Sequence, residues 1–167
     1  MPILRSLVRR RTAPQEADLA FFSRILQEGY GPGAWHGADI KAAIDGTSAA
    51  QAFRRPAAGR HNIAEIALHH AYYVHSVRGR VTTAPIEPFA VAGDDWFELD
   101  GTSGLGWDQV REVLDTQCAK LAALVADIDS GKVKAAKDDA SVLELVLGIA
   151  CHSAYHAGQV ELIKKLL

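Results

Sequence analysis

The distribution of proline constrains this chain more than any other feature of its sequence. All six prolines lie at or before Pro88, so none interrupts the C-terminal half. Proline inside a helix removes a hydrogen bond and clashes with the preceding turn, so its absence permits long helices. Apolar residues recur three or four positions apart in the proline-free stretches, as in an amphipathic helix. Because the segments 81–83 and 89–91 are too short to build a sheet, the pattern predicts an all-α fold.

Four segments have this helical period. They cover residues of about 15–29, 62–78, 106–129 and 141–167, with shorter helical turns around 38–45 and 48–53. The second helix is expected to stop at Gly79, and the fourth to begin at Ser141, which has capping-box spacing to Glu144. The prediction is a four-helix bundle with crossover connections. It forms a single domain over 1–167, with an N-terminal arm at 1–14 and a long connecting loop at 80–105.

Composition excludes several classes of protein. Eighteen Lys and Arg against twenty Asp and Glu give a formal charge of −2, which disfavours nucleic-acid binding. The longest apolar run, Leu145–Cys151, is far shorter than the roughly 20 residues that span a bilayer, so no membrane association is expected. Two cysteines cannot build a disulfide framework or a four-thiolate zinc site. With no evident signal peptide, the expected location is the cytoplasm.

Two histidines continue the apolar stripe of the fourth predicted helix. His152 and His156 lie four residues apart, so their rings leave the helix on the same side. A buried imidazole is costly unless its nitrogens find partners, and a divalent cation would satisfy both rings. The alternative is a pair of core histidines that hydrogen-bond to neighbouring helices. Ser153 follows the first histidine, so this is not the H-E-x-x-H signature of metalloproteases.

A third ligand would have to come from elsewhere, and the second helix offers two candidates. His69 and His70 lie three and four residues after Ile66, so the hydrophobic period does not separate them. Glu65 has capping-box spacing to Asn62, which favours a role at the helix N-terminus over one as ligand or base.

Several stretches resemble a known family. They are Gly33–Gly37 (GAWHG), His61–Ile63 (HNI), Ile63–His69 (IAEIALH) and His152–Gln159 (HSAYHAGQ). In order and spacing they resemble the DinB-like (DinB/YfiT) superfamily over residues of about 16–167. The resemblance implies a four-helix bundle, often a homodimer, that binds one divalent metal ion through three histidines. Carried over, those ligands are His69, His152 and His156, with zinc or nickel as the expected metal.

The resemblance also bears on activity. Relatives include metal-dependent transferases of low-molecular-weight thiols, thiol-dependent isomerases and proteins described as hydrolases. Three neutral imidazoles leave at least one coordination position open, which favours catalysis over a structural role. The expected function is activation of a thiol or water for attack on a small electrophile. The alternative is a non-catalytic metal-binding or stress-related interaction protein, and no catalytic residue can be assigned.

Neighbouring residues allow further hypotheses. Gln159 could orient a metal ligand or the substrate. For Tyr155, such a role and that of a core aromatic residue with its hydroxyl at the rim are equally plausible. Cys151 is expected to be a buried small hydrophobe, because adjacent helical positions point about 100° apart and it cannot share the direction of His152. Three tryptophans in or beside loops are expected to cover the mouth of the bundle or to contact substrate: Trp35, Trp96 and Trp107.

Overall fold

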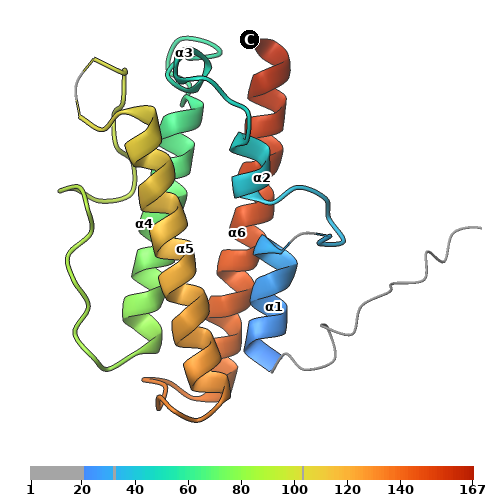
Figure 1. Ribbon diagram of the computed structural model, residues 1–167, viewed down its shortest axis with the longest axis vertical. Helices are drawn as coiled ribbons and strands as arrows, with labels where there is room; N and C mark the ends of the chain where they lie inside the picture. Colours follow the sequence, from blue (N-terminus) through green and yellow to red (C-terminus); the bar gives the residue numbers. More distant parts are fainter. Residues whose placement is uncertain (1–20, 32, 103) are drawn as a thin grey trace, which may run out of the picture.

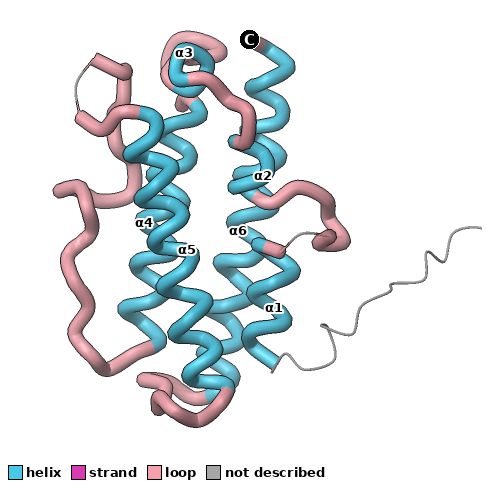
Figure 2. The backbone as a smooth tube through the Cα atoms, viewed as in Figure 1, coloured by secondary structure: helices cyan, strands magenta, loops and turns pink. Residues whose placement is uncertain are grey.

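The computed structural model describes residues 21–31, 33–102 and 104–167, which are helical or loop and contain no strand. The all-α prediction is therefore confirmed over these residues (Figures 1 and 2). The helices are α1 (Phe21–Tyr30), α2 (Ile40–Ile44), α3 (Ala49–Ala52), α4 (Ile63–Val81), α5 (Trp107–Asp129) and α6 (Asp139–Leu166). The predicted arm at 1–14 and the start of the first predicted helix at 15–20 lie outside the described residues.

Four helices form the bundle. In Figure 1, α4 and α5 run in the same direction, and α1 and α6 run in the opposite one. The connection from α4 to α5 therefore has to return along the whole side of the bundle, as the pink tube in Figure 2 shows. This is the expected crossover connection, and it brings residues near 95–99 alongside the first turns of α4.

The N-terminus of α4 agrees with the prediction, but its C-terminus does not. Asn62 caps the helix, and a reciprocal capping box with Glu65 is present as expected. The predicted stop at Gly79 is wrong, since α4 continues to Val81. Val81 is fully buried, and its carbonyl accepts a hydrogen bond from Ala136 N, so tertiary packing extends the helix. Gly79 instead allows a close approach, because an added Cβ would lie 3.0 Å from Ile86 Cδ1.

The start of α6 also differs from the prediction. The N-cap is Asp138, whose carboxylate accepts a hydrogen bond from Ser141 N at 2.9 Å. Ser141 is therefore inside the first turn, and its spacing to Glu144 does not mark the cap. A carboxylate near a helix N-terminus also interacts favourably with the helix dipole, which explains why Asp138 takes this position.

The core has two apolar clusters. One is formed largely by α2, α4, α5 and α6, and contains Ile40, Ile63 and Leu114. The other joins α1, α4, α5 and α6. Gly29 allows α1 to approach α6, because an added Cβ would lie 2.5 Å from Ala150 Cα. Among the described residues, no helix is both long and apolar enough to cross a membrane.

Candidate metal centre

Three histidines meet between α4 and α6. His69 comes from α4 and His152 and His156 from α6, and one ring nitrogen of each lies within 4.8 Å of the other two. His69 and His156 are buried, whereas His152 is half-buried. Of the two candidates on α4, His69 therefore belongs to the cluster. His70 is fully buried behind it, against the other ring nitrogen of His152.

Two of the three rings are oriented by fixed hydrogen-bond acceptors. His69 Nδ1 lies 2.8 Å from the Asp95 carbonyl oxygen, and His156 Nδ1 lies 2.7 Å from Gln159 Oε1. Since carbonyl oxygens only accept, each Nδ1 carries the proton of its neutral ring and each Nε2 keeps its lone pair. Outer partners of this kind fix the tautomer and direction of metal-ligating histidines. Gln159 thus has the orienting contact that its position suggested, although to His156.

The third ring, His152, is oriented by a buried relay. Its Nδ1 lies 3.0 Å from His70 Nδ1, and His70 Nε2 lies 2.6 Å from the Tyr30 hydroxyl. When His70 Nε2 donates to the Tyr30 hydroxyl, that hydroxyl can donate in turn to the Ile149 carbonyl, 3.4 Å away. His70 can pass a hydrogen bond in either direction, because a neutral imidazole has one donor and one acceptor nitrogen.

The two directions of the relay have different consequences for the cluster. His152 Nε2 lies 2.9 Å from His156 Nε2. If His70 donates to His152, then His152 donates to His156, and the two rings of α6 are satisfied by protein alone. If His152 donates to His70, the Nε2 lone pairs of His152 and His156 face each other, and a bound cation would compensate both. Both arrangements hold the same number of protons, so the residues fit a metal ion without having to lose one.

Burial keeps the three rings in the neutral form that a metal requires. Desolvation lowers the pKa of His152 to about 4, and the neighbouring His156 and His69 lower it further. Desolvation also lowers the pKa of His156 to about 4, although the hydrogen bond that His156 donates to Gln159 opposes this shift. The pKa of His69 is lowered by burial as well, and its bond to Asp95 opposes that shift. All three rings are therefore in the neutral, singly protonated form at neutral pH.

Two further site residues, Asp95 and Trp96, come from the long connection. Asp95 was not predicted, whereas Trp96 was one of three tryptophans expected to cover the mouth of the bundle or to contact substrate. Asp95, whose carbonyl holds His69, has a φ of +59°. This left-handed conformation is uncommon outside glycine, although aspartate tolerates it better than most residues. The Asp95 Oδ1 atom lies 3.2 Å from His69 Nδ1 and accepts a hydrogen bond from the Tyr73 hydroxyl. Trp96 stacks between His61 and His69, with ring centroids 3.6 and 3.8 Å away.

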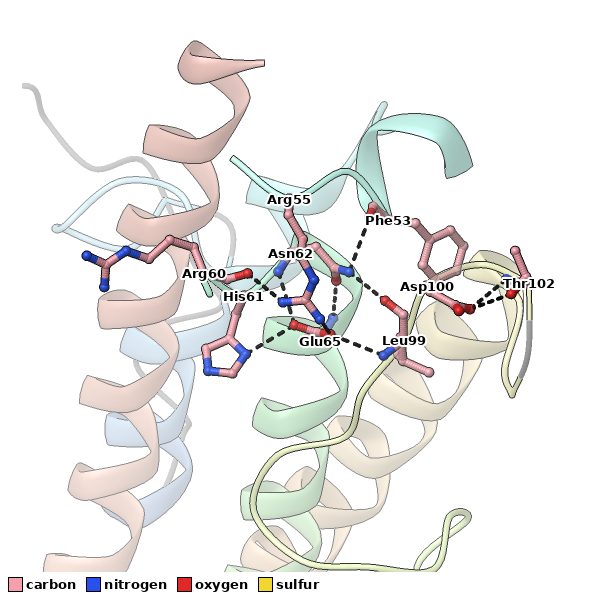
Figure 3. A network of polar contacts seen from close by, with 9 residues as sticks. All are labelled: Phe53, Arg55, Arg60, His61, Asn62, Glu65, Leu99, Asp100 and Thr102. Atoms are coloured by element: carbon pink, nitrogen blue, oxygen red, sulfur yellow. Dashed lines mark hydrogen bonds and ion pairs between the residues drawn. The ribbon is translucent and has the colours of Figure 1, made fainter. Parts of the chain in front are cut away.

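A second polar network lies one turn before the histidines on α4 (Figure 3). Glu65 is 1% exposed and pairs with the Arg55 guanidinium and with His61 Nδ1. It also accepts hydrogen bonds from the backbone N–H groups of Asn62 and Leu99. Glu65 therefore joins the start of α4 to both loops that flank it, and so positions the connection that carries Asp95 and Trp96. The sequence indicated its capping role but not these other partners.

A cavity of about 610 Å³ lies beside the histidines. Two of its lining residues, Trp96 and Gln159, contact His69 and His156 respectively. Tyr155 also lines the cavity. Because it is 62% exposed, the interpretation of Tyr155 as a core aromatic residue is wrong. The remaining lining is formed by the 56–61 loop and by apolar residues of α4 and the last turns of α6.

Neither cysteine contributes to the cluster. Cys118 is half-buried, and burial raises the pKa of its thiol to about 12, which keeps it protonated. Cys151 is exposed, so the expectation that it is buried is wrong. Although Cys151 is next to His152 in the sequence, its exposure places it on the outward face of α6.

A family model describes most of the chain. The model of the DinB superfamily matches residues 34–160, which include all three clustered histidines. The chain belongs to the DinB superfamily. No curated protein and no solved structure matches it. Proteins of the DinB superfamily typically bind metal, and the histidine cluster of this member could hold one ion.

Proposed function

We propose that this DinB-superfamily protein binds one divalent metal ion, zinc or nickel, through Nε2 of His69, His152 and His156. The observation that carries the proposal is the convergence of three neutral imidazoles, each with a separate outer partner at Nδ1. Imidazole is a common ligand of both metals. The three side chains supply no negative charge, so the ion would keep its full charge for chemistry.

We further propose that the protein is a metal-dependent enzyme of the thiol S-transferase or hydrolase type. When bound, the ion would lower the pKa of a thiol or water and so prepare it to attack a small electrophile. Neither cysteine lies in the cluster, so the reacting thiol would have to be a substrate, such as a low-molecular-weight thiol. Around the ion, Trp96 would exclude water over His69, while Asp95 and Gln159 keep two rings in place.

Metal content tests the first step. We expect close to one ion per chain in protein purified without added metal, by elemental analysis. Substitution of His69, His152 or His156 by alanine should abolish metal binding. His75→Ala, on α4 like His69 but outside the cluster, should leave it unchanged. Near-stoichiometric metal that survives all three substitutions would refute the site.

Activity tests the second step. Loaded protein is incubated with a panel of low-molecular-weight thiols and a small electrophile, with the His156→Ala variant as the matched control. Conjugation or hydrolysis that needs both metal and His156 supports the enzyme. A protein that binds metal stoichiometrically but accelerates neither reaction would favour the non-catalytic alternative.

A further inference from the structure

The polar side chains around the cavity beside the histidines are mostly hydrogen-bond donors. No Asp or Glu of the described residues lines this cavity, and its polar residues are Arg60, His61, Trp96, Tyr155 and Gln159. A guanidinium and an indole N–H group donate and cannot accept. His61 is the exception, because its Nδ1 pairs with Glu65 and its Nε2 keeps a lone pair in the neutral ring. A ligand that satisfies this lining must therefore bring acceptors of its own.

Tyr155 is a donor because of a chain of hydrogen bonds that begins at the metal site. His156 Nδ1 carries the ring proton and donates to Gln159 Oε1 at 2.7 Å. This bond fixes the orientation of the amide, whose Nε2 then donates to the Tyr155 hydroxyl at 3.0 Å. Because an amide nitrogen only donates, the Tyr155 oxygen is the acceptor here, and its own proton is left for another acceptor. Tyr155 lines the cavity and is well exposed, so this proton is available to a ligand.

Arg60 brings a positive charge to the same cavity. Its backbone is held in the loop, since its N–H donates to the Ala57 carbonyl and its carbonyl accepts from Arg55. The guanidinium of Arg60 has no partner among the described residues. Figure 3 shows its side chain leading away from Glu65, on the side of α6. Glu65 therefore neutralises the charge of Arg55 but not that of Arg60.

The rest of the lining is apolar. Leu162 and Leu166 are 59% and 63% exposed, and they border the cavity together with Ile66 and Ile163. Large apolar side chains exposed beside a cavity are typical of a site where a ligand covers them. The chain as a whole has a formal charge of −2, so its average field does not attract anions. An anion that binds here needs this local arrangement.

We propose that the cavity binds the substrate, and that this substrate is a small molecule with an oxyanion, such as a carboxylate, on an apolar body. The inference rests on the proposed function for the word substrate, whereas the binding itself does not require the metal. Arg60 pairs with the charged group, the Tyr155 hydroxyl donates a hydrogen bond to it, and the apolar lining accommodates the body. The cavity volume of about 610 Å³ is in the usual range for small-molecule sites.

An NMR titration of the metal-free full chain tests the class of ligand, because amide shifts detect weak binding and also locate it. Hexanoate has both a charge and an apolar body, whereas acetate lacks the body and 1-hexanol lacks the charge. We expect hexanoate to bind about tenfold more tightly than either, with the shift changes gathered around the cavity. Equal affinity for hexanoate and 1-hexanol, shifts centred elsewhere, or no saturable binding would overturn the proposal.

Two arginine substitutions separate the site from a general effect of charge. Arg60→Gln should weaken hexanoate binding about tenfold and leave 1-hexanol binding unchanged, because only the pairing with the charge is lost. Arg80→Gln is the matched control, since it removes the same charge near the far end of α4 and should change neither affinity. Both arginines are exposed, so both variants should fold. Equal weakening by the two variants would contradict the role of Arg60.

Two further variants test the Tyr155 hydroxyl. Tyr155→Phe keeps the ring and removes one donor, so hexanoate should bind about threefold to tenfold more weakly. Gln159→Glu replaces the amide donor by a carboxylate, which accepts the Tyr155 proton and withdraws it from the ligand, so binding should weaken at least as much. Unchanged hexanoate binding in both variants would remove Tyr155 from the site.

Failure of this proposal can be told apart from failure of the proposed enzyme. Neither metal content nor thiol conjugation enters the titration, so absent hexanoate binding beside stoichiometric metal overturns the role of the cavity alone. If the loaded protein is inactive while hexanoate binds as expected, the proposed reaction is wrong and the assignment of the cavity to this class of ligand is supported.

Discussion

Two buried polar clusters lie one turn apart on α4, and they differ in how completely the protein satisfies them. Glu65 has a partner for its charge and two backbone donors, all supplied by the chain. The histidine cluster has an outer partner for every Nδ1, but its inner nitrogens face only one another. Glu65, His69 and His156 are all buried, so burial does not distinguish the two clusters.

The difference teaches which polar cluster is structural and which is available for a ligand. Groups that satisfy one another hold loops in place, as Glu65 does for the segments around Arg55 and Leu99. The three histidine rings are each held by a hydrogen bond at Nδ1, while their other ring nitrogens converge. These nitrogens are therefore available to bind a ligand. The experiments below test this contrast, beginning with the largest expected effect.

Glu65→Ala should destabilise the protein with and without metal. It leaves two backbone donors and the Arg55 guanidinium without their acceptor, which we expect to cost about 3 kcal/mol or more. Urea unfolding measures the loss. In contrast, His156→Ala should abolish the stabilisation that added metal gives. A Glu65→Ala protein of wild-type stability would show that this cluster does not hold the loops.

His70→Phe should weaken metal binding while keeping the fold. It fills a similar volume but removes the acceptor for His152 Nδ1, and loss of such an outer partner typically costs 10- to 100-fold in affinity. Competition with a chromogenic chelator measures the affinity, and His70→Asn, which can still accept a hydrogen bond, should recover part of it. An unchanged affinity in His70→Phe would remove the relay from the account.

Asp95→Ala should have a smaller effect on stability. The left-handed backbone costs alanine about 1 kcal/mol or more, and the variant also loses the Tyr73 bond. Asp95→Gly removes the backbone strain and should be the more stable of the two. Because the Asp95 carbonyl remains in both variants, metal affinity should change by only a few fold. Equal thermal midpoints for the two would contradict the role assigned to the φ angle.

The metal-free protein should lose stability gradually as the pH falls from about 6.5 toward 4. The folded pKa of His152 and His156 is lowered to about 4 from the ordinary value of 6.5, so the unfolded chain binds protons first in this window. The stabilisation is complete above that window and is lost as the pH falls through it. Unfolding at several pH values should give a flatter profile for His156→Gln, and an identical slope would argue against the lowered pKa.

The sequence predicted the helices and the histidine pair of α6 because both depend on periodicity. It could not choose between His69 and His70 by period, since both follow Ile66 at helical spacing, and only the rotation of α4 against α6 separates them. Asp95 lies in an aperiodic connection, where no pattern indicates which residues return to the site, and for the same reason the sequence could not separate Trp96 from Trp35 and Trp107. Cys151 was misplaced for a different reason. The apolar run around it hides which side of α6 faces outward, because both sides are apolar.

Diffraction data collected at the metal's absorption edge test the central claim most directly, because they locate the ion itself. For crystals of the metal-loaded protein, the account predicts one anomalous peak per chain, within bonding distance of Nε2 of His69, His152 and His156, with His70 remaining on Nδ1 of His152. A peak coordinated by His70, a peak away from these residues, or no peak in protein that binds metal in solution would contradict it.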